Sequence, residues 1–369
     1  MKKPIYLDYA SSTPVDFEVV ESMEPYLEKY FGNPSCSHLF GIETKNPMEH
    51  ARKQVAELLG CQPDEIVFTG GVTESNNHAI KGTAFAYQNR GKHIISTTIE
   101  HPSITRCCKF LELFGFTTTY IPVDKYGVVD VKQLEKSITD QTILVSVMHV
   151  NNQIGTIQPL DEISRITRKY GIILHSDATQ SVGKVALNVK MPEIDIVSTS
   201  GHKSYAPKGV GALYIRNGVQ IENLIHGSKQ EKGRRAGTEN VQGIVGLGKA
   251  YEIAGRDWEK NVSNMKEMKE LLYKELKRNF KEIHLNGHLE KSSPDILNIS
   301  FKGMTSGELY NKMKDFVAVT PDTSYVLDAI NLSEEWKKCA IRFSVGKRTT
   351  KNEIIEAVSI IKKILDSAS

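Results

Sequence analysis

The sequence lacks the features that mark secreted, membrane-bound or metal-binding proteins. Only five cysteines occur in 369 residues, and their irregular spacing contains no paired CxxC arrangement. This number is odd and too low for a disulfide scaffold, so we expect reduced thiols and no metal site. No apolar run reaches the length of a membrane span, and the first two lysines are not followed by the apolar segment of a signal peptide. We therefore expect a cytoplasmic protein that does not enter a membrane.

An excess of charge of one sign is also missing. Lysine and arginine number 47 against 44 aspartates and glutamates, giving a net charge of +3, and the basic residues are spread along the chain. This distribution argues against nucleic acid as a ligand. We find no internal repeat and no low-complexity tract, and the length suits a large domain with a smaller companion.

Short apolar runs alternate with helical patterns through the first two thirds of the chain. The runs predict buried strands at residues 65–69, 93–97, 142–149, 172–175, 194–198 and 211–215. Strands separated by helices favour parallel pairing, and hence an α/β layer structure over residues 15–256. Ligands of such a sheet gather at the carboxyl ends of its strands.

A continuous helical pattern over residues 241–280 predicts the connection to a second, smaller unit. Beyond it we expect strands at 296–301, 316–319 and 339–344, and helices at 307–315, 325–330 and 351–367. This pattern predicts a small α+β domain formed by residues 1–14 and 257–369.

Polar residues at the carboxyl ends of two predicted strands carry the most direct chemical signal. Asp177 follows a buried strand within His175–Gln180, where its carboxylate needs a cationic partner such as a protonated pyridine nitrogen. Capping of the next helix is the simpler interpretation of Asp177 alone. Lys203 follows the next strand within Ser200-Gly201-His202-Lys203, where partial burial favours the neutral amine that attacks an aldehyde, although most single lysines are merely solvated. Together these two positions predict a pyridoxal-phosphate enzyme that carries its cofactor as a Schiff base on Lys203.

Three further positions are compatible with such a cofactor, although each has an ordinary alternative. The turn Gly70-Gly71-Val72-Thr73 joins a strand to a helix start, which offers free N–H groups to a phosphate but is common in α/β proteins. His101 precedes Pro102 and either caps a helix or faces a planar ligand. Asn152 follows a strand, where its amide binds a cofactor oxygen or completes a turn.

The ordered motifs resemble the pyridoxal-phosphate cysteine desulfurases of the class V aminotransferase group over nearly the whole chain. The matching segments are Tyr6–Ala10, Thr13-Pro14, Phe31–Ser35, Ser37-His38, Thr73–Asn77, Glu100-His101, His149–Gly155, Ser176–Gln180, Ser200–Lys203, Gly233–Asn240 and Ile341–Ser344. The resemblance implies an aminotransferase fold of type I, with a large domain around a mostly parallel sheet and a small α+β domain.

The resemblance also implies roles around the cofactor ring. Lys203 would bind pyridoxal 5′-phosphate covalently, and Asp177 would pair with the pyridine nitrogen. Gln180 and Asn152 would contact the ring oxygen and neighbouring groups. His101 would stack on the ring and shuttle protons.

Further roles implied by the resemblance concern the phosphate and the substrate. Four residues would hold the phosphate, the last of them from the other subunit of a homodimer: Thr73, Ser200, His202 and Thr238. Arg342 would bind the substrate carboxylate with its guanidinium fork, and Asn33 would face the substrate.

One part of the family pattern is missing. Members carry a cysteine on a mobile loop after a strand of the small domain, but here Val319 runs directly into Thr320. Either the loop exists in the protein and lies outside this sequence, which the intact cofactor set favours, or it is deleted. Cys36 is the only other thiol near a motif on the substrate side, whereas Cys339 shares a strand face with core residues.

The leading functional hypothesis is conversion of L-cysteine to L-alanine, with the sulfur passed as a persulfide to an acceptor protein for iron–sulfur cluster or thio-cofactor synthesis. Two alternatives remain open. One is a pyridoxal-phosphate lyase or aminotransferase without the acceptor loop, which would release pyruvate or another keto acid. The other is a cofactor-bearing scaffold without desulfurase activity.

Overall fold

We describe a computed structural model covering residues 3–322 and 324–366. A seven-stranded sheet with the order β2-β8-β7-β6-β5-β3-β4 forms its centre. The strands span Ile66–Thr69 (β2), His93–Thr97 (β3), Thr117–Ile121 (β4), Thr142–Ser146 (β5), Ile173–Asp177 (β6), Ile196–Ser200 (β7) and Gly211–Ile215 (β8). Neighbours from β7 to β4 pair in parallel, while β8 is antiparallel to both β7 and β2. The predicted α/β class with a mostly parallel sheet is confirmed.

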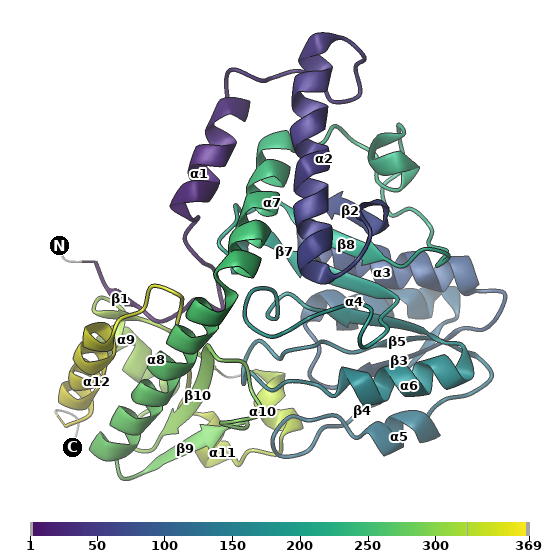
Figure 1. The fold of residues 1–369 in the computed structure, drawn as a ribbon. Coiled ribbons are helices and arrows are strands. Elements are labelled where there is room, and N and C mark those ends of the chain that lie inside the picture. The colour runs from purple at the N-terminus through teal and green to yellow at the C-terminus, as the bar shows by residue number, and fades with distance from the viewer. Residues whose placement is uncertain (1–2, 323, 367–369) are drawn as a thin grey trace.

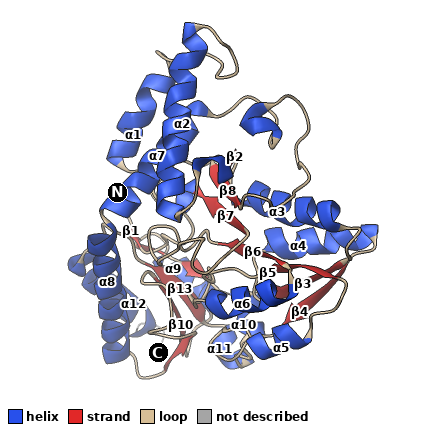
Figure 2. Ribbon diagram, turned by 45° about the vertical axis from the view of Figure 1, so that its right-hand side comes forward, coloured by secondary structure: helices blue, strands red, loops and turns tan. Residues whose placement is uncertain are grey.

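Helices cover both faces of this sheet (Figures 1 and 2). One face packs on α3 (Val72–Tyr87) and α4 (Pro102–Leu111), and the other on α2 (Leu39–Leu59), α6 (Leu160–Tyr170) and α7 (Val241–Arg256). Alternate residues of one strand enter the two cores, as Ile95 and Ile94 of β3 do. This double burial explains why the strands read as continuous apolar runs.

A second core forms beside this layer. Its sheet has the order β12-β13-β10-β9, with β9 at Ile283–Asn286, β10 at Ile296–Phe301, β12 at Thr320–Pro321 and β13 at Ala340–Ser344. It packs on α8 (Trp258–Asn279), α9 (Ser306–Met313) and α12 (Lys351–Asp366). The N-terminal β1 (Ile5–Tyr6) pairs in parallel with β11 (Val317–Ala318), so the start of the chain lies with this core. The domain boundaries at 15–256 and at 1–14 with 257–369 stay a prediction.

Short helices complete the chain. These are α1 (Phe17–Met23), α5 (Val131–Lys136), α10 (Tyr325–Ala329) and α11 (Glu334–Lys337). Within residues 3–322 and 324–366, no helix combines the length and apolar character needed to cross a bilayer.

The expectation of one continuous helix over residues 241–280 is wrong. The helix breaks at Asp257, whose φ of −103° and ψ of 17° leave the helical range, and α8 begins at the next residue. Gly255 lies two residues before the break, but the helical pattern continues across it. The end of the predicted terminal helix, Ser367, lies outside the described residues.

Candidate active site

The polar residues at the carboxyl ends of β6 and β7 meet at one edge of the large sheet. Asp177 is the last residue of β6, and Lys203 ends the short helical turn Gly201–Lys203 that follows β7. Both line a cavity of about 210 Å³ together with Ala10, Ser11, Val72, His101, Met148, Val150, Asn152, Thr179, Gln180 and Arg342. Because the strands are parallel, their carboxyl ends bring residues far apart in sequence to the same edge.

Lys203 is held by the backbone of the N-terminal segment. Its Nζ donates to the carbonyl oxygens of Ala10 at 2.7 Å and Ser11 at 2.6 Å. Burial, together with the nearby cations Lys184 and Arg342, lowers the pKa of Lys203 to about 8. A lysine with this pKa has a substantial neutral fraction near pH 8, as an amine that attacks an aldehyde requires.

Asp177 is 6% exposed and accepts two hydrogen bonds from neutral donors. Its Oδ2 accepts from Asn76 Nδ2 at 2.8 Å, and its Oδ1 from the Thr179 amide at 2.9 Å. Neutral donors do not balance the charge of a buried carboxylate, whereas a protonated ring nitrogen would. The donor set around Asp177 therefore fits pyridoxal phosphate.

His101 both caps a helix and lines the cavity. Its Nδ1 accepts from the Ser103 amide at 3.2 Å at the start of α4, so the simpler of the two predicted roles is present. Burial lowers its pKa, which favours a neutral imidazole. The carboxylate of Asp177 acts in the opposite direction and the charge of Lys203 in the same direction.

Arg342 crosses from β13 of the small sheet to the cavity. Its Nη2 lies 3.0 Å from Asp8 Oδ1 and donates to Ser11 Oγ at 2.6 Å and Thr320 Oγ1 at 3.0 Å. Nη1 donates to the Asn152 carbonyl at 2.9 Å, while Nε is buried without a hydrogen-bond partner among the described residues. The guanidinium thus has one unsatisfied donor, which is buried, and its other nitrogens bond to residues around the cavity.

The predicted phosphate residues lie beside the cavity rather than in its wall. Gly71 adopts a φ of 140°, favoured by glycine, and precedes α3, which begins without a side-chain cap. The first N–H groups of α3, including that of Thr73, are thus free for an anion. Ser200 is buried at the end of β7, and His202 Nδ1 lies 3.3 Å from Ser12 Oγ.

Two predicted residues lie elsewhere in this chain. Thr238 lines a separate cavity of about 90 Å³ with Gly70 and Arg235. Asn33 precedes α2 and accepts from the Ser35 amide at 2.9 Å, and it does not line the cavity of Lys203. A single chain thus does not bring these two side chains to the site.

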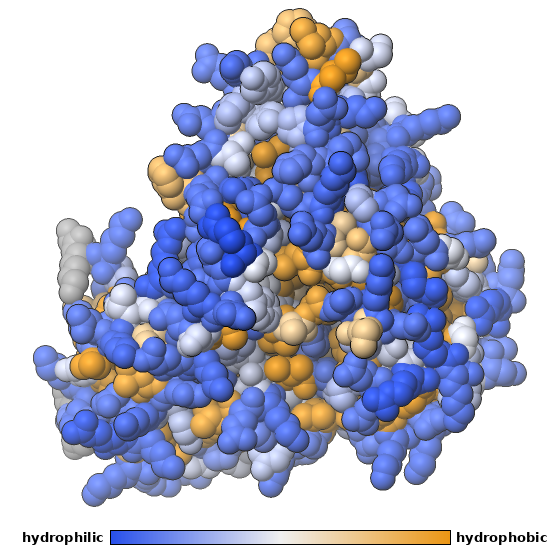
Figure 3. Space-filling model, viewed as in Figure 1, coloured by the Kyte–Doolittle hydropathy of each residue, from blue (hydrophilic) through white to orange (hydrophobic). Residues whose placement is uncertain are grey.

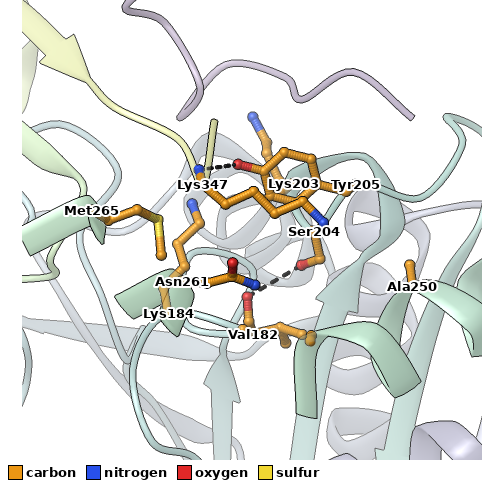
Figure 4. Close-up of a pocket in the computed structure, with 11 residues that line it drawn as sticks. Val182, Lys184, Lys203, Ser204, Tyr205, Ala250, Asn261, Met265 and Lys347 are labelled. Carbon is orange, nitrogen blue, oxygen red and sulfur yellow. Dashed lines mark hydrogen bonds between the residues drawn. The ribbon is translucent and has the colours of Figure 1, made fainter. Parts of the chain in front are cut away.

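Sequence reasoning missed several residues that shape the site. One of them is Lys184, whose Nζ donates at 3.1 Å to Oε1 of the predicted residue Gln180. Gln180 Nε2 in turn donates to the Ala10 carbonyl at 3.0 Å. Lys184 and Lys203 also border a small cavity of about 20 Å³ that reaches Met265 of α8 (Figure 4). Lys184 carries no local sequence signal, whereas Asn76 and Asp8 stand within the motifs that carry the family resemblance.

Comparison with known proteins agrees with this geometry. The aminotransferase class-V profile matches residues 5–356. A cysteine desulfurase IscS of Dictyoglomus turgidum is 44% identical over 377 residues, covering 99% of this chain and 95% of that protein. The chain belongs to the cysteine desulfurases of the class-V aminotransferase family. The predicted family and its cofactor, pyridoxal 5′-phosphate, are confirmed.

Other relatives extend this result. IscS of Klebsiella pneumoniae is 44% identical and covers 98% of this chain and 93% of its own. The solved structure of a NifS-like protein has a TM-score of 0.95 at 38% identity and covers 99% of this chain and all of that one. The structure of SspA in complex with cysteine has a TM-score of 0.82 at 35% identity, covering 94% and 99% of the two chains.

Proposed function

We propose that this chain is a cysteine desulfurase that removes sulfur from L-cysteine and leaves L-alanine. The convergence of Lys203, Asp177 and Arg342 on one cavity carries the proposal, and the cysteine desulfurase relatives support it.

Each residue then has a defined task. Bound pyridoxal phosphate supplies the electron sink. Lys203 would hold the cofactor through its aldehyde, and its neutral amine would take the proton from Cα of the substrate. Asp177 supplies the negative charge that keeps the ring nitrogen protonated, and Arg342 binds the substrate carboxylate. Gln180, Asn152 and His101 contact the ring, and His101 moves protons near it.

A homodimer is part of the proposal. Thr73, Ser200 and His202 would hold the phosphate with Thr238 of the partner, because Thr238 does not reach the cavity within its own chain. Large apolar side chains are exposed around the start of α2, where Figure 3 shows an apolar tip: Leu27, Phe31, Leu39, Phe40 and Ile42. Burying these side chains against a second copy would bring Asn33 toward the partner's site.

The sulfur would leave as a persulfide on an acceptor that serves iron–sulfur cluster or thio-cofactor synthesis in the cytoplasm. The test is to incubate the holoenzyme with L-cysteine and a reducing thiol, and to measure alanine, sulfide and pyruvate. Alanine and sulfide in equal amounts support the proposal. The Lys203→Ala variant is expected to form neither.

A lyase is the second candidate, and the direct junction of Val319 and Thr320 favours it, since a family cysteine is missing there. A lyase would release pyruvate instead of alanine. Pyruvate as the main product would therefore replace the desulfurase proposal.

A further inference from the structure

At Val319 the chain passes directly from one strand of the small domain to the next. A single residue separates β11 from β12, and β12 pairs directly with β13, placing Thr320 opposite Arg342 and Pro321 opposite Ile341. The amide of Asp322 then donates to the Ala340 carbonyl at 2.9 Å. In the sequence as it stands, the chain thus follows the edge of the small sheet without a break.

Both ends of this segment are anchored. Thr320 Oγ1 donates to Asp8 Oδ1 at 2.8 Å, and the buried Asp322 accepts from Asn298 Nδ2 at 2.6 Å. At the start of α10, the Tyr325 hydroxyl donates to the Glu100 carbonyl, next to His101 of the site. These bonds hold the backbone in the place from which a loop would have to leave.

Four of the chain's five thiols lie in packed surroundings away from the cavity. Burial raises the pKa of Cys61 and of Cys108 to about 12 and that of Cys107 to about 11. Burial also raises the pKa of Cys339, whose Sγ donates to the carbonyls of Glu335 and Trp336. The thiolate is the nucleophile, so burial disfavours the reactive form of these four thiols, and none of them lines the cavity.

The fifth thiol, Cys36, lies in the connection between α1 and α2. Its amide donates to the Asn33 carbonyl at 3.0 Å, and this connection projects at the top of Figure 1, away from the strand ends that bear Asp177 and Lys203. Within one chain it therefore does not reach the substrate sulfur.

The cavity is open to solvent from the substrate side. Ser11, His101, Asn152 and Lys203 all line it and all remain partly exposed. The cations Lys203 and Arg342 lie in the same wall, and positive charge favours the thiolate form of a thiol that enters. The site thus offers an approach and a suitable charge to a thiol that is not part of this chain.

We infer that the sulfur acceptor of this enzyme acts in trans: a thiolate from another molecule attacks the cysteine sulfur directly, with no persulfide on this chain. The inference rests on the proposed function. One S–S bond forms in the acceptor, the Cβ–S bond of cysteine breaks, and the proton of the acceptor thiol is matched by the proton added at Cβ. Cysteine and RSH thus give alanine and RSSH, and no further oxidant or reductant is needed.

The test is a single turnover with holoenzyme in molar excess over L-cysteine, after all free thiols are removed. One sample receives no thiol, one receives 2-mercaptoethanol, and one a reduced peptide with a single cysteine. Alanine is quantified, and intact mass shows whether the chain has gained a sulfur atom. The matched variant is Cys36→Ser, which removes the one thiol a second copy of this chain could present.

We expect almost no alanine without added thiol, alanine in proportion to either thiol when it is present, and no added sulfur on the chain. Cys36→Ser should behave as the wild-type protein. A full equivalent of alanine without added thiol, with a persulfide on the chain that the Cys36→Ser variant loses, would overturn the inference but leave the desulfurase function intact. Pyruvate, or no product with either thiol, would instead refute the proposed function. A response to the peptide alone would restrict the acceptor to a polypeptide.

Discussion

Lys184 and Asp295 form a buried ion pair between the large sheet layer and the small core, with Nζ and Oδ2 2.7 Å apart and side-chain exposures of 5% and 0%. The same ammonium group donates to Gln180 at 3.1 Å. Because a lysine only donates, it turns the amide oxygen of Gln180 toward itself and leaves Nε2 facing Ala10. One cation thereby connects the packing of the two cores to the orientation of Gln180 in the cavity wall.

Lys184→Met should destabilise the protein by about 3–5 kcal/mol, because it leaves the carboxylate of Asp295 buried without its partner. Urea unfolding of the holoenzyme measures this loss. The double variant Lys184→Met/Asp295→Leu is the control and should recover most of the stability, since it removes both charges. A loss below about 1 kcal/mol, the size found for surface pairs, would contradict this account of the pair.

The lowered pKa of Lys203 predicts how cofactor capture depends on pH. Burial favours the neutral amine, so the reactive fraction increases as pH rises through about 8. The rate at which cofactor-free protein binds pyridoxal phosphate, followed by visible absorbance, should show its midpoint there and level off above it. A midpoint near the ordinary lysine value of about 10.4 would refute the shift.

Lys203→Ala should abolish the visible absorbance of the bound cofactor. Its control is Lys208→Ala, which removes an exposed lysine five positions along the chain and should leave the spectrum unchanged. Normal absorbance in Lys203→Ala would show that another residue carries the cofactor.

Arg342→Lys should raise KM for cysteine roughly tenfold to hundredfold, since hydrogen bonds between charged groups contribute about 1.5–3 kcal/mol and lysine lacks the guanidinium fork. The cofactor spectrum should not change. Arg348→Lys is the matched control, because that side chain is 53% exposed and pairs with Asp16. A fall in kcat at constant KM would show that Arg342 does not bind the substrate carboxylate.

Glu231 anchors the segment that leads to Thr238. Its carboxylate accepts from Arg52 at 2.7 and 2.8 Å and from the Phe68 amide at 2.8 Å, and its side chain is 2% exposed. Glu231→Gln should cost about 2–3 kcal/mol in urea unfolding, because Arg52 loses its buried partner and keeps only the partly exposed Glu49 at 3.1 Å.

The matched surface control for this pair is Glu193→Gln, which breaks a pair with Arg168 whose side chains are 57% and 38% exposed. It should cost no more than about 1 kcal/mol. Equal effects of the two variants would mean that burial of the Glu231 pair does not decide its contribution.

The sequence by itself determined the α/β class and the placing of polar residues at the strand ends. Apolar runs such as His93–Thr97 and Gly211–Ile215 are buried on both faces, so their composition alone reveals them. Strand β4 was missed because its residues, Thr117–Ile121, are mostly polar and form an edge that is buried only at Ile121. Asp177 and Lys203 could be singled out because Asp177 ends β6 and Lys203 lies in the short turn after β7, so local order places both at the strand ends.

Tertiary structure alone decided which distant residues meet. The contacts of Lys184 with Asp295 and of Arg52 with Glu231 span more than a hundred residues, and no periodicity of the chain encodes them. The hydrogen bonds of Thr320 with Asp8 and Arg342 likewise could not be predicted from the sequence, because they depend on how the small sheet pairs. Period and composition report what each segment buries, whereas the pairing of buried charges depends on how the segments pack in three dimensions.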